Sequence, residues 1–488
     1  MDFRALNAVL CVGFLAGVAG CDEPQTGPVK ISAFGPPPKL VNPNLEPLPP
    51  PSALLLQATA QGLVRFDSAG EIEPALAQSW IVSDDGLRYT FRLRRIDWPD
   101  GNRVTADQVA ARLRASLSRP SRNPLKPVLG AVTGIVAMTD EVLEIGLSGP
   151  RPNFLQLLAQ PEMAIIFNGR GTGPYIVSHA DAAGALLVRR TTDADEDPEE
   201  KEGSGPPGLL LRGESATVAV ARFAQQESDA ILTGTIGELP LVRAADIPAA
   251  RLQFDPVAGL FGLAFGSAEG PLAEPEIRQA LSMAIDRQTL ANALRVPGIA
   301  VRTALVPPGT VELVAPSQPE WAASPLPMRR ELASRRIASL ELDEPLRLRV
   351  SMPDSPGYRI LFAHIRHDWR LVGVEAERVG PEVQADLRLV DQVAPSVLAS
   401  WYLRHFACDS SEVCDPAADL AMEAARTALS RIDRRTQLAT ADGILAGLTP
   451  FIPLTTPVRW SLVSPRLTGF RTNQFGRHPL GELITETE

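Results

Sequence analysis

The chain has 488 residues, 45% of them hydrophobic, and it carries a formal net charge of -10 at pH 7. This length exceeds what a single hydrophobic core usually serves, so we expect two or more lobes. The acidic balance argues against a nucleic-acid partner, because nucleic-acid binding favours a basic surface.

The N-terminus is typical of an exported protein. Arg4 precedes an apolar segment over residues 5–19, which has the length of a signal-peptide core and is too short to span a membrane. The segment ends in Val18-Ala19-Gly20-Cys21, which resembles the bacterial lipoprotein signal. This resemblance implies that residues 1–20 are removed and that a lipid on Cys21 anchors the protein in the cell envelope, on the periplasmic side. An ordinary signal peptide with a chance cysteine is the alternative.

A tether and the first strand follow the signal. Residues 22–51 are rich in Pro and Gly, and we assign residues 21–28 to the tether. The sequence Val29-Lys30-Ile31-Ser32 predicts the first strand of the first lobe.

Residues 62–117 predict a strand, turn, strand, turn and helix in that order. Asp84-Asp85-Gly86 tolerates a tight reversal between an apolar run at 80–82 and alternating residues at 87–93, which predicts a β-hairpin with one buried face. Thr105 and Gln108 form a capping box that opens a helix reaching Leu117.

The order of short motifs in this stretch resembles that of a known protein family. GLV, PALAQSW, SDDGLRYTFRLR, W-x-DG and VTADQV follow one another over residues 62–109. This succession resembles the peptide-binding (family 5) class of extracellular solute-binding proteins, which are the receptors of ABC importers. Three later segments resemble the same family: GTGPY at 171–175, RQALSMAIDR at 278–287, and residues 415–454. GTGPY lacks the residues of a phosphate-binding loop, so we interpret it as a structural turn.

The resemblance implies a two-lobed α/β fold of the periplasmic-binding-protein (Venus-flytrap) type. A peptide or peptide-like small molecule would be captured in the interlobe cleft by hinge closure, and an ABC permease and ATPase would be the partners. We expect a monomer. The expected divisions are lobe I over 29–70, 168–257 and 466–488, an accessory subdomain over 71–167, and lobe II over 258–465.

Four cysteines are present. Cys11 lies in the expected signal peptide and Cys21 would carry the lipid, which leaves Cys408 and Cys414 in an exported protein. A disulfide is therefore expected between them. A redox-active pair is the alternative, although such pairs usually have closer CxxC spacing.

No pattern indicates catalysis. GxSxG and HExxH are absent, and the histidines are scattered, so we expect neither an enzyme nor a cofactor. His364 and His367 stand three apart on a predicted helix but have no third ligand nearby, which argues against a metal site. Two alternatives stay open: a secreted hydrolase, and a receptor-fold envelope sensor or interaction protein that is no longer coupled to import.

The family resemblance also suggests ligand-binding residues. Many peptide-binding members use a W-x-x-D-Y-like stretch whose Asp pairs with the amine of the peptide. The matching stretch here runs from Trp401 and Tyr402 to His405, and it places Arg404 where that Asp would be. We therefore expect an anionic group on the ligand that hydrogen-bonds to Arg404, and we expect Trp401 to form an apolar wall of the cleft. Asp409 as the true counterpart, and Arg404 as a surface residue, are the alternatives.

Overall fold

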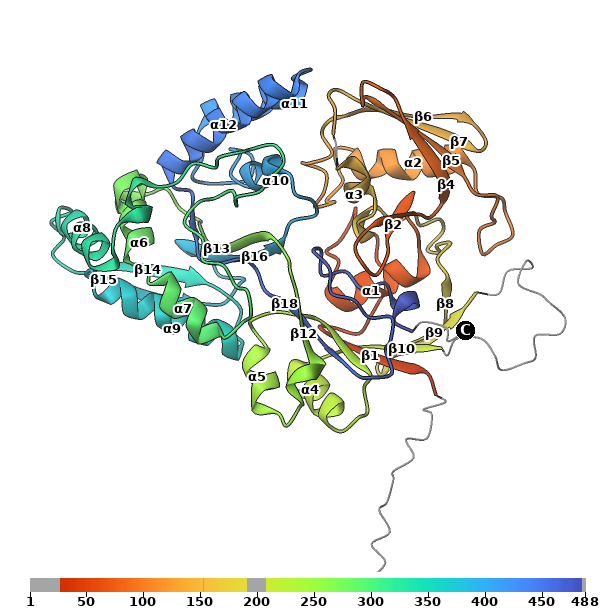
Figure 1. The fold of residues 1–488 in the computed structure, drawn as a ribbon, viewed down its shortest axis with the longest axis horizontal. Helices are drawn as coiled ribbons and strands as arrows, with labels where there is room; N and C mark the ends of the chain where they lie inside the picture. Colours follow the sequence, from red (N-terminus) through yellow and green to blue (C-terminus); the bar gives the residue numbers. More distant parts are fainter. Residues whose placement is uncertain (1–26, 152, 191–207, 485–488) are drawn as a thin grey trace, which may run out of the picture.

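The computed structural model describes residues 27–151, 153–190 and 208–484. Within these residues the chain forms two lobes, each built on its own mixed sheet, and a smaller subdomain beside the first lobe (Figure 1). Residues 1–26, which include the expected signal peptide, Cys21 and most of the tether, lie outside the described residues. No helix in the described ranges is both long enough and apolar enough to cross a bilayer.

Lobe I is organised around a seven-stranded sheet. Its central strand β1 (Val29–Phe34) begins at the predicted Val29 and pairs parallel with β10 (Leu209–Glu214) and β11 (Ala230–Gly234). Strand β11 buries alternate residues on opposite faces: Leu232 belongs to the core that includes α1 (Pro50–Thr59), and Ile231 to the core that includes α4 (Ala216–Ala224) and α5 (Leu239–Ala244). The strand order is β12 (Leu252–Asp255), β18 (Arg459–Val463), β11 (Ala230–Gly234), β1 (Val29–Phe34), β10 (Leu209–Glu214), β9 (Gly184–Arg189) and β8 (Tyr175–Asp181).

Lobe II is organised around a five-stranded sheet. Its strand β13 also has two buried faces, because Phe261 and Leu263 belong to one core cluster while Leu260 and Ala264 belong to another. The first cluster includes α6 (Pro275–Ala284), α7 (Arg287–Leu294), α8 (Leu326–Ala338) and α9 (Pro356–Arg370), and the second includes α10 (Ala399–Arg404), α11 (Pro416–Thr427) and α12 (Arg431–Leu448). The strand order is β15 (Val374–Val379), β14 (Leu346–Ser351), β16 (Leu387–Val393), β13 (Gly259–Phe265) and β17 (Phe451–Pro453).

The accessory subdomain contains the hairpin and the helix that the sequence predicts, and both are confirmed. Val82 pairs with Tyr89 across a turn in which Gly86 has a φ of 69°, a value that favours glycine. Thr105 and Gln108 form the predicted capping box. The elements are β4 (Ala77–Val82), β5 (Arg88–Leu93), β7 (Val142–Leu147) and β6 (Val132–Thr139), in sheet order, with α2 (Ala106–Leu117), α3 (Phe154–Leu158) and the 3-10 turn η1 (Pro161–Met163).

Two of the expected boundaries differ from the structure. The division at residue 70 cuts the hairpin of β2 (Val64–Phe66) and β3 (Ile72–Pro74), whose Phe66 is buried in the core of the accessory subdomain. The division at residue 465 places β18 in lobe II, whereas β18 pairs antiparallel with β11 and β12 in the sheet of lobe I. The chain therefore passes between the lobes from β12 to β13 and again from β17 to β18.

Candidate functional site

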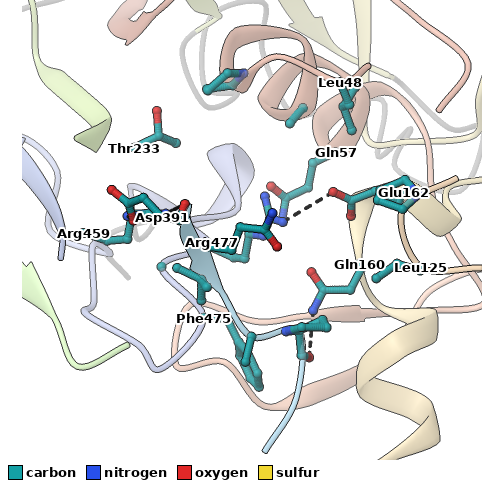
Figure 2. Close-up of a pocket in the computed structure, with 18 of the residues that line it drawn as sticks. Leu48, Gln57, Leu125, Gln160, Glu162, Thr233, Asp391, Arg459, Phe475 and Arg477 are labelled. Carbon is teal, nitrogen blue, oxygen red and sulfur yellow. Dashed lines mark hydrogen bonds and ion pairs between the residues drawn. The ribbon is translucent and has the colours of Figure 1, made fainter. Parts of the chain in front are cut away.

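A cavity of about 530 Å³ lies where both lobes and the accessory subdomain meet (Figure 2). Lobe I contributes α1, the end of β11 and residues 475–478. The accessory subdomain contributes Gln160 and Glu162, and lobe II contributes residues 391–395 and one side of α10. A molecule in this cavity would touch all three parts at once.

An ion pair joins the two lobes at the cavity wall. Arg459 of β18 lies with Nη1 2.7 Å from Oδ1 of Asp391 on β16, and both side chains are largely buried. Tyr358 of α9 donates a hydrogen bond of 2.7 Å to the other oxygen of Asp391. Burial by itself lowers the pKa of Arg459, but the charge of Asp391 and the hydrogen bond to it outweigh burial, so the pKa lies above its usual value. Burial, and after it the same carboxylate, raises the pKa of the Tyr358 phenol.

A second and looser ion pair lies across the cavity. Nη2 of Arg477 is 3.6 Å from Oε1 of Glu162, and Figure 2 shows the two side chains pointing toward one another. Arg477 comes from the C-terminal segment of lobe I, whereas Glu162 follows α3 in the accessory subdomain. Arg477 and Glu162 are therefore brought together only by the fold.

Trp401 and His405 form an aromatic wall on α10. They lie one helical turn apart, their ring centroids are 4.5 Å apart, and both line the cavity. Nδ1 of His405 donates to the carbonyl of Trp401 over 2.9 Å. Burial lowers the pKa of His405, so the neutral imidazole is favoured at neutral pH.

Thr233 also lines the cavity, and its backbone conformation is strained. The register between β11 and β18 shifts between Ile231 and Gly234, and Thr233 at this irregularity has a φ of 66°. Such a value is unusual for a β-branched residue. Its hydroxyl is buried and has no hydrogen-bond partner among the described residues.

Direct hydrogen bonds also connect the accessory subdomain with lobe II. Gln160 donates to the carbonyl of Pro395 over 3.0 Å at the edge of the cavity. Farther out, Arg151 donates to the carbonyl of Arg426 over 3.0 Å, and Arg426 donates to Ser148 over 3.2 Å. Burial, followed by the neighbouring charges, lowers the pKa of Arg151 to about 10. The cavity is thus bounded by contacts that require the lobes to lie close together.

The sequence of residues 71–402, more than half of the chain, matches the family model of the bacterial extracellular solute-binding proteins, family 5 (middle region). The chain belongs to this family.

Known relatives of this solute-binding protein cover most of its length. It is 26% identical to the nickel-binding periplasmic protein of Escherichia coli, over 78% of this chain and 75% of that protein. It is 24% identical to the probable ABC transporter periplasmic-binding protein SapA of E. coli, over 85% of this chain and 84% of SapA. The crystal structure of Haemophilus influenzae OppA in complex with RPPGFSPFR superposes with a TM-score of 0.78 at 18% identity, covering 94% and 98% of the two chains. This likeness confirms the two-lobed α/β fold.

Of the four predicted ligand-binding residues, only Trp401 lines the cavity of this solute-binding protein. Tyr402 is 1% exposed and lies within the core of lobe II. Arg404 is absent from the cavity lining; burial lowers its pKa, and the charges that act on it are those of α11, α12 and Asp409. Asp409 is exposed beyond the end of α10. The side chains of this segment that lie beside the cavity are Trp401 and His405, and the role of Arg404 in binding an anion stays a prediction.

Four charged residues of the cavity were missed by reasoning from the sequence: Glu162, Asp391, Arg459 and Arg477. They come from separate structural elements, and no local motif marks any of them.

The two remaining cysteines are bonded to one another in the structure. The Cα atoms of Cys408 and Cys414 are 5.1 Å apart, and the bond closes the loop between α10 and α11. The backbone N–H of Cys408 donates to Asp419 of α11 over 3.0 Å. Among the described residues, no group of three or more His, Cys, Asp or Glu side chains is arranged to hold a metal ion.

Proposed function

We propose that this protein is the extracytoplasmic receptor of an ABC importer, and that it captures a peptide or peptide-like small molecule in the interlobe cavity. The observation that carries the proposal is the cavity of about 530 Å³ whose walls come from both lobes, in a chain of the family 5 solute-binding class. Pockets that enclose small ligands commonly have volumes of about 300–1,000 Å³. The H. influenzae OppA complex supports a peptide-like ligand, because that protein holds a peptide on the same fold.

Binding alone accounts for this role. Because the cavity walls belong to both lobes, a bound molecule adds contacts that favour the closed arrangement, and its release requires the lobes to separate. The names of the E. coli relatives describe periplasmic binding proteins. These names support a periplasmic location. We further propose a lipid tether on Cys21, a monomeric state, and delivery of the ligand to a permease and ATPase without catalysis of a reaction.

Native mass spectrometry of protein purified without unfolding tests the receptor role. We expect one small molecule or peptide bound per chain, released when the protein is unfolded and rebound when it is returned. The comparison is a chain carrying Trp401→Ala, which removes an aromatic wall of the cavity but keeps the ion pair of Asp391 and Arg459, and it should lose the bound mass. A parent protein that carries no bound molecule, and takes up none from a peptide and amino-acid mixture, would reject the proposal.

A further inference from the structure

The charged groups that face the cavity differ in how completely they are paired. Asp391 and Arg459 pair with each other over 2.7 Å. Nε2 of His478 lies 3.1 Å from Oδ2 of Asp255, and both side chains are buried. These three cavity-lining groups have partners within the protein.

His405 is also occupied. Nδ1 donates to the carbonyl of Trp401, so Nε2 of the neutral ring is an acceptor. It lies 2.8 Å from the side-chain amide of Gln392, whose NH₂ group donates to it once the amide is flipped. The charged groups of the lining that remain open to a further partner are therefore Glu162 and Arg477, which touch each other only at 3.6 Å.

The carboxylate of Glu162 is half-satisfied. Its Oε1 faces Arg477, whereas its Oε2 is buried and accepts no hydrogen bond from any described residue. The Glu162 side chain lines the cavity and is 15% exposed, and its only charged partner within the described residues lies 3.6 Å away, so the carboxylate can accept from a donor on a ligand. Arg477 in turn retains N–H groups for an acceptor, since a guanidinium has five donors.

Hydrogen bonds from two buried asparagines fix the backbone at Glu162 and Arg477. The amide of Asn123 donates to the backbone carbonyl of Glu162 over 2.7 Å. The amide of Asn473 donates to the backbone carbonyl of Arg477 over 2.6 Å, and its oxygen accepts from the N–H of Arg477 over 3.2 Å. Both asparagines are 3% exposed. A site whose backbone is fixed in this way loses little entropy when a ligand binds.

We propose that Glu162 and Arg477 together bind an α-amino acid head group, in which an ammonium and a carboxylate sit on one carbon. The ligand carboxylate accepts from the guanidinium of Arg477, and the ligand ammonium donates to the exposed part of the Glu162 carboxylate. Because the two side chains are neighbours, the two ligand charges must be neighbours too. A linear peptide separates its terminal charges by peptide units and satisfies only one of these residues. This inference rests on the proposed receptor function and narrows its ligand class.

Calorimetric titration of the full mature chain with defined probes tests the head group. The probes are leucine, glutamine, phenylalanine, glutamate and arginine, each supplied free, N-acetylated or as the α-amide. We expect at least one free amino acid to bind at least about tenfold more tightly than both of its capped forms, because each cap removes one charged partner. Glu162→Gln and Arg477→Gln should each weaken that binding by a similar factor.

The matched controls are Glu331→Gln and Arg335→Gln, which alter an exposed pair of the same residue types on α8 and should bind as the parent does. If a capped form binds as well as the free one, or if Glu162→Gln and Arg477→Gln bind as the controls do, the head-group inference is wrong. Binding of tripeptides without any binding of free amino acids overturns this inference but leaves the receptor function standing. Binding of neither class, with no co-purified molecule, rejects both. Because the capped probes need no variant, a variant that fails to fold does not block the test.

Discussion

Asp391 on β16 and Arg459 on β18 form an ion pair of 2.7 Å that joins the sheet of lobe II to the sheet of lobe I (Figure 2). Arg459 pairs in register with Asp255 at the end of β12, and Asp391 with Phe261 near the start of β13, so both lie close to where the chain passes between the lobes. Tyr358 of lobe II donates to the same carboxylate over 2.7 Å. Its hydroxyl also lies 3.3 Å from the hydroxyl of Thr235 in lobe I, which makes a second contact between the lobes.

The first prediction concerns this pair. Asp391→Asn keeps the shape and the acceptor for Tyr358 but leaves the charge of Arg459 buried without a counter-charge. We expect the free energy of unfolding to fall by about 3–5 kcal/mol in denaturant titrations. Glu344→Gln, which removes an exposed partner of Arg347 at 3.7 Å, should change it by less than about 0.5 kcal/mol. Equal stability of the two variants would contradict the prediction.

Local patterns predicted local structure well. The turn at Asp84-Asp85-Gly86 and the capping box at Thr105 depend on neighbours within a few residues, and both form as expected. The boundary at residue 465 was wrong because strand pairing decides it: β18 pairs with β11, more than 200 residues earlier, and nothing within β18 indicates this.

The candidate site was predicted only in part for the same reason. Trp401 lies in a segment that resembles a family motif, and it does line the cavity. Glu162 and Arg477 lie more than 300 residues apart, and they carry no pattern that distinguishes them from surface charges. Only the tertiary fold brings Glu162 and Arg477 close together. Arg404 does not line this cavity, because a residue's place in a motif does not fix which side of a short helix faces the cavity.

The second prediction is a pH dependence of stability that arises at His405. Its pKa is lowered in the folded protein by burial, so the unfolded chain takes up a proton first as the pH falls. The stability contribution of the neutral ring is complete above about pH 6.5, the unperturbed value, and is lost as the pH falls toward the folded pKa.

The measurement is the free energy of unfolding between pH 7.5 and pH 5 for the parent and for His405→Asn. Asn retains a donor for the carbonyl of Trp401 but does not titrate. The parent should lose more stability than the variant over this interval, with a difference in slope of at most about 1.4 kcal/mol per pH unit. Parallel curves for the two proteins would exclude His405 as the source.

The third prediction concerns the disulfide. If Cys408 and Cys414 are bonded in the exported protein, the denatured mature chain should react with no thiol reagent until it is reduced. Replacing both with Ser should lower the free energy of unfolding by about 2 kcal/mol, because the closed loop is short. Two alkylatable thiols in the unreduced chain, beyond Cys21 itself, would disprove the bond.

The fourth prediction concerns the anchor. Cys21→Ser removes the thiol that would carry the lipid, so the protein should shift from the membrane fraction to the periplasmic extract or keep its signal peptide. Cell fractionation with intact-mass measurement decides between these results and an unchanged protein. Cys11→Ser, within the signal itself, serves as the control and should leave both fractionation and mature mass as they are. A Cys21→Ser protein with parental mass and membrane retention would rule out lipidation at this residue.

The fifth prediction concerns the junction of the lobes at Gly357, near the start of α9. Its N–H donates to the carbonyl of Gly237 in lobe I over 2.8 Å, and a Cβ at this position would lie 1.7 Å from the carbonyl oxygen of Ile236. The Cβ is bonded directly to the backbone of α9 and the oxygen belongs to the backbone of lobe I, so neither atom can move away by rotation of a side chain. Gly357→Ala must therefore push the start of α9 away from lobe I.

We expect Gly357→Ala to lower the free energy of unfolding by at least about 2 kcal/mol and to weaken ligand binding, because the cavity walls that belong to different lobes move apart. Small-angle scattering should show a larger radius of gyration in the presence of ligand than the parent has. The control is Gly380→Ala, where an added Cβ would meet no atom within 4 Å, and which should match the parent in stability and affinity. If the two alanine variants behave alike in scattering and in binding, contact at Gly357 does not set how closely the lobes approach.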